Sequence, residues 1–130
     1  MTQELPPGAD AIGRIMGKTA DEAFATLSAM YGPDMAMEVM NIGRIWERPA
    51  LTRRERSFVA IAALVAMGTR HRLRIHVQGA LNHGATREEV EEVILTTMIY
   101  AGHGRATEAI EVARAVFAAG AGDEPSVGLD

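Results

Sequence analysis

The chain has 130 residues, of which 48% are hydrophobic, and its formal net charge is -4. This length suits a single domain that buries a core of its own. The absence of cysteine excludes disulfides and every mechanism that needs a thiol. The acidic balance argues against binding to nucleic acid or to an acidic membrane. No stretch has the length of a membrane span and no secretory signal is recognisable, so we expect a cytoplasmic protein.

Both ends of the chain have the composition of tails. The first residues include Pro6 and Pro7, and the last ones combine glycines, Pro125 and acids. We therefore predict an N-terminal tail over residues 1–18, one helical domain over residues 19–118 and a C-terminal tail over residues 119–130.

The segment between the tails has the hydrophobic period of helices, and no alternating strand pattern competes with it. The pattern predicts an all-α bundle of about six helices. They cover residues 20–31, 33–48, 53–67, 69–82 and 87–101, with a last helix that includes residues 106–117. Three of these helices begin with a threonine followed three residues later by a glutamate, which predicts capping boxes. These pairs are Thr19 with Glu22, Thr52 with Glu55, and Thr86 with Glu89. The helix over residues 53–67 is apolar nearly all round, so we expect it to be central or to lie at a subunit interface.

Two histidines are candidates for chemistry. His76 lies three residues after Leu73 and four before Ala80, which places its imidazole on the inward stripe of its helix. From this spacing alone, a packed core histidine is the commoner explanation. His103 lies between Gly102 and Gly104 at a helix break, where the backbone can approach a ligand closely. A simple turn histidine explains that position equally well.

Arginines gather in two groups, Arg53, Arg54 and Arg56 and then Arg70, Arg72 and Arg74, while the chain has one lysine. Guanidinium groups bind carboxylates at two points, which suits an anionic substrate or ion pairs between subunits, although a solvated position is commoner for any single arginine. The histidines and acids do not have the spacing of a metal site, and the two glycines beside His103 are not a dinucleotide motif. We therefore predict no metal and no cofactor.

The segment from Gly43 to Phe117 resembles the carboxymuconolactone decarboxylase family. The matching stretches include Ile45-Trp46-x-Arg48-Pro49, Arg53-Arg54-x-Arg56-Ser57, Leu73-Arg74-x-His76-Val77, Ala80-Leu81-Asn82-x-Gly84 and Tyr100-Ala101-Gly102. The related alkylhydroperoxidase-D branch has a Cys-x-x-Cys pair where this chain has Thr69 and Arg72, and a glutamate where it has Ser57. The chain therefore resembles the cysteine-free decarboxylase branch, and thiol peroxidase chemistry is excluded.

The resemblance implies an alkylhydroperoxidase-D-like fold that assembles as a homotrimer or homohexamer. It also implies a cofactor-free carbon–carbon lyase that decarboxylates a carboxylated butenolide, such as 4-carboxymuconolactone in aromatic catabolism. The resemblance implies His76 as the catalytic proton donor or oxyanion partner, and we take His103 and Tyr100 as further catalytic candidates. The candidate substrate-binding residues are Arg44, Trp46, Arg54, Arg56, Ser57 and Arg74.

Three positions depart from the family pattern and leave other functions open. The pattern has a glutamate where this chain has Arg44, a proline where it has Gly104, and an asparagine where it has Thr107. A charge reversal beside a substrate changes what that position can recognise. One alternative is a biosynthetic tailoring enzyme that decarboxylates, isomerises or cyclises another acidic lactone or a polyketide-like compound. A second alternative is a non-catalytic helical binding subunit in which His76 is only packed.

Overall fold

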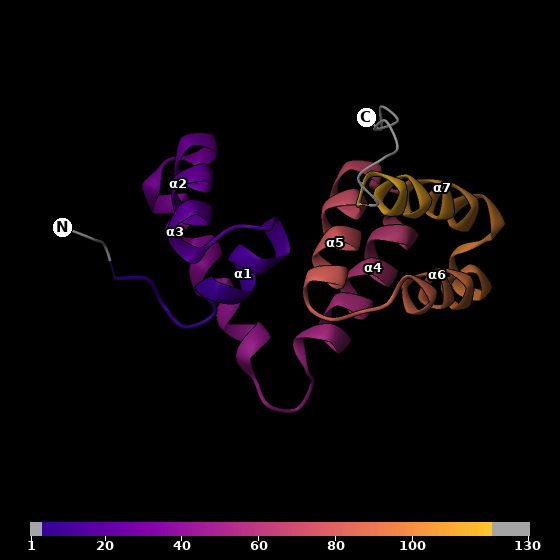
Figure 1. Cartoon of the computed structure of the whole chain (residues 1–130), viewed down its shortest axis with the longest axis horizontal. Coiled ribbons are helices and arrows are strands. Elements are labelled where there is room, and N and C mark those ends of the chain that lie inside the picture. The colour runs from indigo at the N-terminus through magenta and orange to yellow at the C-terminus, as the bar shows by residue number, and fades with distance from the viewer. Residues whose placement is uncertain (1–3, 121–130) are drawn as a thin grey trace.

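A computed structural model describes residues 4–120, which form seven α-helices and one 3-10 helix (Figure 1). In chain order the elements are α1 (Ala9–Met16), α2 (Ala20–Tyr31), α3 (Pro33–Ile42), the 3-10 helix η1 (Gly43–Glu47), α4 (Arg53–Met67), α5 (Arg70–Asn82), α6 (Arg87–Ala101) and α7 (His103–Gly120). The predicted all-α class is confirmed. None of the helices in this part of the chain is long and apolar enough to cross a membrane.

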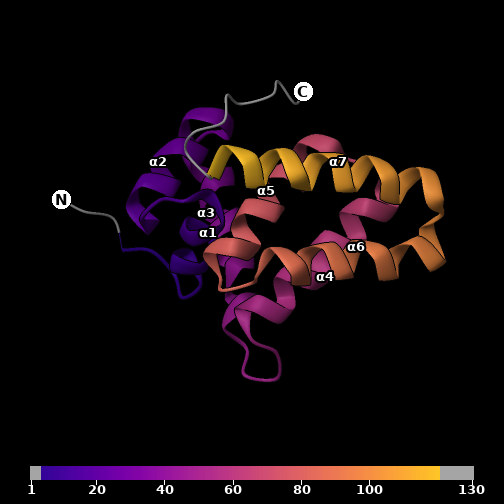
Figure 2. The ribbon, with the colours of Figure 1, turned by 45° about the vertical axis from the view of Figure 1, so that its right-hand side comes forward.

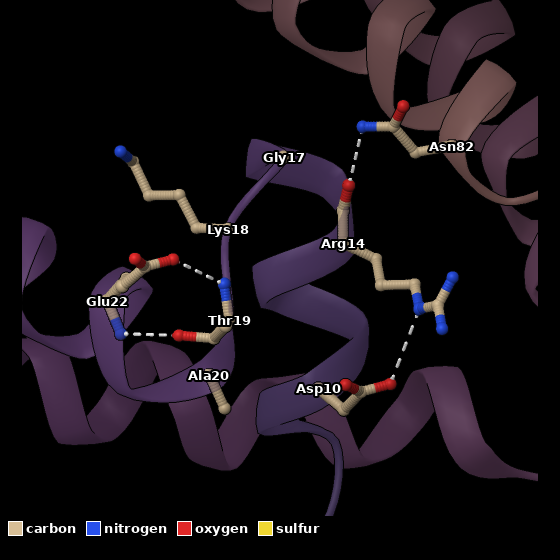
Figure 3. Close-up of a pocket in the computed structure, with 8 residues that line it drawn as sticks. All are labelled: Asp10, Arg14, Gly17, Lys18, Thr19, Ala20, Glu22 and Asn82. Carbon is tan, nitrogen blue, oxygen red and sulfur yellow. Dashed lines mark hydrogen bonds and ion pairs between the residues drawn. The ribbon is translucent and has the colours of Figure 1, made fainter.

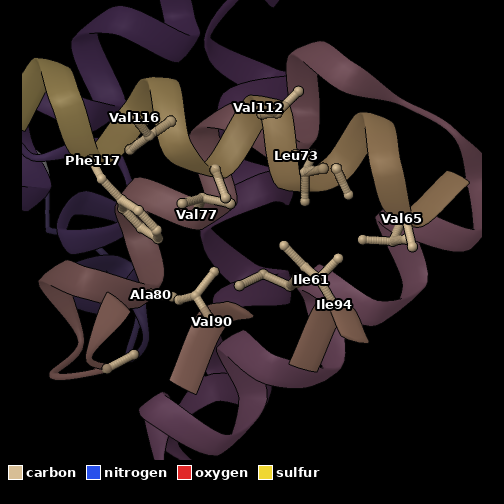
Figure 4. Close-up of a cluster of buried hydrophobic side chains, with 14 residues drawn as sticks. Ile61, Val65, Leu73, Val77, Ala80, Val90, Ile94, Val112, Val116 and Phe117 are labelled. Atoms are coloured by element: carbon tan, nitrogen blue, oxygen red, sulfur yellow. The ribbon is translucent and has the colours of Figure 1, made fainter. Parts of the chain in front are cut away.

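The helices form two groups, α1–α3 and α4–α7, each packed around its own hydrophobic cluster (Figures 1 and 2). In the larger cluster, side chains from four helices converge on one centre, among them Ile61, Val77, Ile94 and Val112 (Figure 4). These four side chains are at most 1% exposed. Full burial of such a side chain contributes about 1.5–3 kcal/mol. Packing within the α4–α7 group therefore fixes the position of α5.

All three predicted capping boxes are confirmed. In the box before α6, the amide of Thr86 donates to Glu89 Oε1 at 2.9 Å, and the amide of Glu89 donates to Thr86 Oγ1 at 3.0 Å. Each box satisfies backbone donors that a helix start leaves without a partner. The starts of α2, α4 and α6 are fixed in this way.

The prediction of a tail over residues 1–18 is wrong for residues 9–16, which form α1. Ala9, Ala11 and Ile15 of this helix are buried. The preceding Gly8 has a φ of +97°, and a Cβ there would lie 2.2 Å from the carbonyl carbon of Gly43. Only glycine allows so close a backbone contact with that φ, so Gly8 lets the start of α1 pack directly against η1. At the other end, α7 includes residues 119 and 120 of the expected C-terminal tail, and residues 121–130 lie outside the described part.

The helix expected over residues 33–48 is two elements. α3 ends at Ile42, and η1 follows directly. Gly43, at the change, packs so closely that a Cβ would lie 2.7 Å from Ile12 Cγ1 and 2.8 Å from the Gly8 carbonyl oxygen. The tighter helix ends at Glu47, and the next residue, Arg48, is extended because Pro49 follows it.

α1 joins the two groups of helices by lying against α5. A Cβ at Gly79 of α5 would lie 3.0 Å from Ile15 Cγ2, so the backbone of α5 and the Ile15 side chain are in direct contact. The Asn82 side-chain amide donates to the Arg14 carbonyl at 2.7 Å. One face of α5 is thereby held toward α1.

Candidate active site

The candidate site is built on the face of α5 that bears Arg72, His76, Gly79 and His83. Their spacing of four, three and four residues places them on one stripe of a helix with 3.6 residues per turn. Arg72 reaches Tyr31 at the end of α2, and Gly79 meets α1. Because His76 lies between them on the same stripe, it faces the α1–α3 group.

His76 is half-buried, and within residues 4–120 it makes no hydrogen bond. Burial lowers the pKa of its imidazole, and the positive charge of Arg72, one helical turn away, lowers that pKa further. The ring is therefore neutral near pH 7. A neutral imidazole can donate one N–H and accept at its other nitrogen. It can therefore donate a hydrogen bond to a negatively charged atom of a bound molecule, or accept a proton from that molecule.

A second imidazole, His83, forms a polar cluster with Ser57 and Trp46. The Ser57 hydroxyl, which is 1% exposed, lies 3.3 Å from His83 Nδ1. The Trp46 ring lies 5.4 Å from the His83 ring between centroids, tilted by 45°. His83 is not among the site residues predicted from the sequence. The signal was present, because His83 is seven residues after His76 and hence on the same helical stripe.

Ionic side chains surround this cluster. Arg53 donates to Asp10 Oδ2 at 2.9 Å and also bonds Glu47, so it connects α4 with α1 and η1. The hydrogen bond from Arg53 holds the pKa of Asp10 below its usual range. Burial, with the charges of Arg53 and Arg14, lowers the pKa of His83, and the backbone of Ala11 opposes this only in part. His83 Nε2 is buried without a well-formed hydrogen bond in the described residues.

Two predicted substrate-binding arginines have other partners. Arg54 binds both carboxylate oxygens of Glu89 on α6, one of them at 3.1 Å, and its guanidinium lies 5.1 Å from the centroid of the Phe58 ring. Arg56 donates to the Arg48 carbonyl at 3.0 Å. These contacts fix α4 to α6 and to the segment after η1. Neither arginine shares a hydrogen bond with His76 within residues 4–120.

The remaining predicted residues are Arg74 on α5, Arg44 on η1, Tyr100 on α6 and His103 on α7. Arg74 Nη2 is 3.3 Å from His71 Nδ1, and Arg44 is exposed on η1. Tyr100, at the end of α6, is 84% exposed. His103 begins α7, where its Nδ1 is 3.4 Å from Thr107 Oγ1, and it lines an open cleft of about 660 Å³. In the described part of a single chain, no hydrogen bond or ring contact joins Tyr100 or His103 to His76.

A further cleft, of about 520 Å³, lies beside α1 and the start of α2 (Figure 3). Its walls carry both signs of charge, with Asp10 and Glu22 as acids and Arg14 and Lys18 as bases. The Glu22 carboxylate accepts from the Thr19 amide in the capping box, and Arg14 Nε lies 3.7 Å from Asp10 Oδ2. This cleft was not predicted, and it does not include His76. Among the residues described, no three His, Asp or Glu side chains come together as a metal site.

The comparison with protein families covers the part of the site that lies on η1, α4 and α5. The model of the carboxymuconolactone decarboxylase family matches residues 35–115. The chain is 41% identical to 4-carboxymuconolactone decarboxylase of Acinetobacter baylyi over 75 residues. These aligned residues are 58% of this chain and 56% of that protein. Over 70 residues it is 33% identical to nitrosuccinic acid decarboxylase of Metarhizium robertsii, covering 54% and 49%.

The chain thus spans about half the length of these two curated relatives. A 15.0 kDa protein of Paracoccus denitrificans, whose name assigns no activity, is 31% identical over 81 residues, which is 61% of this chain and 60% of that protein. The family model includes η1, α4, α5 and α6 in full, and with them Ser57, His76 and His83. With most of its helical region matched in this way, the chain belongs to the carboxymuconolactone decarboxylase family.

Proposed function

We propose that this protein is a cofactor-free decarboxylase of an activated organic acid, with His76 as its acid–base residue. The observation that carries the proposal is the half-buried imidazole of His76, which has no hydrogen-bond partner within residues 4–120 and is neutral near pH 7. The His76 nitrogens are not among the buried polar atoms that lack a partner in the described residues, so they are reachable from solvent. A ring in this position can offer its donor and its acceptor to another molecule.

The reaction needs little from the protein. The bond between the carboxylate and its carbon breaks, CO2 leaves, and the electron pair moves into a conjugated acceptor group of the substrate. His76 donates an N–H to the acceptor oxygen as its negative charge develops. The carbanion then takes one proton, which closes the balance, either from His76 in its protonated form or from water.

The names of two relatives support an acid that carries its own electron acceptor. In 4-carboxymuconolactone the acceptor is the unsaturated lactone, and in nitrosuccinic acid it is the nitro group. The electron pair left by CO2 becomes an enolate in the first and a nitronate in the second, so neither needs an electron sink from a cofactor. Both molecules also keep a second carboxylate after the reaction. We therefore propose a dicarboxylic acid with one activated carboxylate, and the lactone is the first candidate because the identity is higher.

The test is turnover by the purified chain of 4-carboxymuconolactone, followed by its ultraviolet absorbance, and of nitrosuccinic acid, followed by CO2 release. His76→Asn keeps a similar size but cannot carry a proton at neutral pH. It is expected to lower kcat by about 10²–10⁴-fold, the usual contribution of an acid–base residue. His71→Asn, on the exposed side of the same helix, is the matched control and is expected to keep its activity.

Two results would reject this function. If the wild-type protein does not exceed the spontaneous rate with either acid, the decarboxylase proposal fails for both candidates. If turnover occurs and His76→Asn changes only the free energy of unfolding, His76 is a packed residue and the chemistry lies elsewhere. Turnover of nitrosuccinic acid alone would favour the biosynthetic alternative over aromatic catabolism.

We also propose that further copies of this chain cover the apolar side chains that α4 and α6 expose. Val59 and Met67 on α4 are 61% and 64% exposed, and Leu95 and Ile99 on α6 are 55% and 76% exposed. Large apolar side chains exposed on two helices that pack against each other, as α4 and α6 do, fit a protein interface. Light scattering at micromolar concentration is expected to give a mass above one chain, and Ile99→Glu is expected to reduce it. A monomer under these conditions would reject the predicted homo-oligomer.

A further inference from the structure

Arg72 is placed to act on whatever His76 binds. It precedes His76 by four residues on α5, and side chains at this spacing lie on one face with about 5–6 Å between their Cβ atoms. Arg72 is exposed, and its charge is the one that affects the His76 imidazole in the described chain. A ligand on His76 therefore lies within reach of the Arg72 guanidinium.

Tyr31 of α2 accepts a hydrogen bond from Arg72 of α5 and thereby connects the two groups of helices. Arg72 Nη2 donates to the Tyr31 hydroxyl oxygen at 3.2 Å, and this is its one hydrogen bond to a side chain within residues 4–120. Because the tyrosine oxygen accepts this bond, its own proton remains free to donate. The other guanidinium N–H groups are also free of side-chain partners in this part of the chain. The pair thus presents several donors and one positive charge.

We propose that Arg72 and Tyr31 form the binding site for the carboxylate that the substrate keeps. This inference rests on the proposed function, and it names the residues that select a dicarboxylic acid over a monocarboxylic one. The fork of a guanidinium matches the two oxygens of a carboxylate. Arg72 binds the retained group, and Tyr31 is a positioning residue that fixes the guanidinium. The activated carboxylate is then held one helical turn away, beside His76.

The arrangement also links substrate binding to the proton that the reaction consumes. With the site empty, the positive charge of Arg72 lowers the pKa of His76. A carboxylate bound to Arg72 neutralises this charge, so the lowering is reduced and the imidazole takes up a proton more readily. A bound acid therefore favours the protonated form of His76, which carries the proton needed after loss of CO2, although burial, the larger cause of the lowered pKa, still opposes protonation.

Three variants test the site by kinetics. Arg72→Gln removes the charge, Arg72→Lys keeps the charge without the fork, and Tyr31→Phe removes only the hydroxyl. With the acid that the wild type turns over, Arg72→Gln is expected to raise KM by roughly 10- to 100-fold with a smaller change in kcat, as for loss of a charged hydrogen bond. Arg72→Lys and Tyr31→Phe are expected to be intermediate. Arg114→Gln, another exposed arginine, which pairs with Glu91, is the matched control.

Direct binding of succinate, measured by calorimetry, separates this inference from the proposed function. Succinate keeps both carboxylates but has no acceptor group, so it binds without turnover. The wild type is expected to bind it more tightly than propionate, and Arg72→Gln is expected to abolish that preference. Tyr31→Phe is expected to weaken succinate binding in the wild-type background and to add nothing to Arg72→Gln, as a positioning role requires.

The outcomes are distinct. Succinate binding that depends on Arg72, without turnover of either acid, would sustain the carboxylate site and reject the decarboxylase. Turnover with unchanged KM in Arg72→Gln, or a wild type that does not prefer succinate to propionate, would overturn the carboxylate site. Circular dichroism checks that each variant is folded. We expect the Arg72 variants to fold because the Arg72 side chain is exposed.

Discussion

The Ser57 hydroxyl on α4 lies 3.3 Å from Nδ1 of His83, beyond the last residue of α5. This contact joins the N-terminal half of one helix to the C-terminal end of the next. It sits beneath Trp46 and beside the Arg53–Asp10 pair, where α1, η1, α4 and α5 meet. It is therefore a contact on which the relative placement of α4, α5 and α1 depends.

Ser57→Ala is expected to destabilise the protein by about 0.5–1.5 kcal/mol, because the hydrogen bond between the Ser57 hydroxyl and the half-buried His83 ring is lost. Ser28→Ala is the matched control, since the Ser28 hydroxyl oxygen is buried but has no partner in the described residues. Removing that hydroxyl is expected to leave the stability unchanged or slightly higher. Urea unfolding measures both. Equal losses in the two variants would show that the Ser57–His83 bond contributes nothing.

Stability is expected to fall between about pH 7 and pH 5, because His76 and His83 both have a lowered pKa in the folded protein. In the unfolded chain their pKa is about 6.5. Below that value the unfolded state binds more protons than the folded state, so acid favours unfolding. The contribution is complete above the unfolded pKa and is lost as the pH falls toward the folded pKa.

The measurement is the free energy of unfolding in urea at a series of pH values. A double variant, His76→Asn with His83→Asn, is expected to flatten the profile over this range. The lowered pKa of Asp10 acts in the same direction in more acidic solution, so a residual slope below the histidine range is expected in the variant. A wild-type profile that is level from pH 8 to pH 5 would contradict the prediction.

Glu89→Ala is expected to cost more stability than Glu55→Ala. Both glutamates complete capping boxes, but Glu89 also binds Arg54 through both of its oxygens. The cap alone contributes about 1 kcal/mol in typical helices. The additional loss from the Arg54 contact is expected to vanish when the two glutamate variants are compared in an Arg54→Ala background. If the difference between them persists there, the ion pair is not its cause.

Gly8→Ala is expected to be far more damaging than Gly17→Ala. Both glycines have positive φ, but a Cβ at Gly8 would lie 2.2 Å from backbone of Gly43, whereas at Gly17 the nearest atom is 3.8 Å away, on Asn82. Gly17→Ala therefore carries only the conformational cost of about 1–2 kcal/mol. Gly8→Ala must also displace α1 from η1. The two variants are compared by thermal unfolding. Similar melting temperatures would mean that the contact between Gly8 and Gly43 tolerates a side chain.

The sequence predicted the three helices that begin with a capping box, and it missed α1, which begins without a side-chain cap. Thr19, Thr52 and Thr86 marked three helix starts by their side chains. α1 begins at Gly8, which makes no side-chain capping bond, and it has only eight residues. Its burial depends on contacts with residues distant in the sequence, such as Gly43 and Gly79. Nothing in the local composition encodes those contacts.

The candidate site was predictable in part. The helical stripe of α5 is a local property, so the position of His76 on it followed from spacing alone. The pairing of Arg54 with Glu89, and of Ser57 with His83, depends on how α4 packs against α6 and α5. Periodicity does not fix the offset between two packed helices. Candidate substrate contacts such as Arg54 were therefore chosen by residue type, and that criterion does not distinguish a free guanidinium from one bound to a neighbouring helix.

The contact between α1 and α5 has a consequence for how the molecule opens. α1 contributes Ala9 to the smaller hydrophobic cluster, whereas its contact with α5 is made by Ile15 against Gly79, so the α1–α3 group can separate from α5 without dividing either cluster. Amides of the smaller α1–α3 group are then expected to exchange with deuterium at a lower free energy than those of α4–α7. Such a partial opening would admit small molecules to the inner side of α5 while most of the chain stays folded.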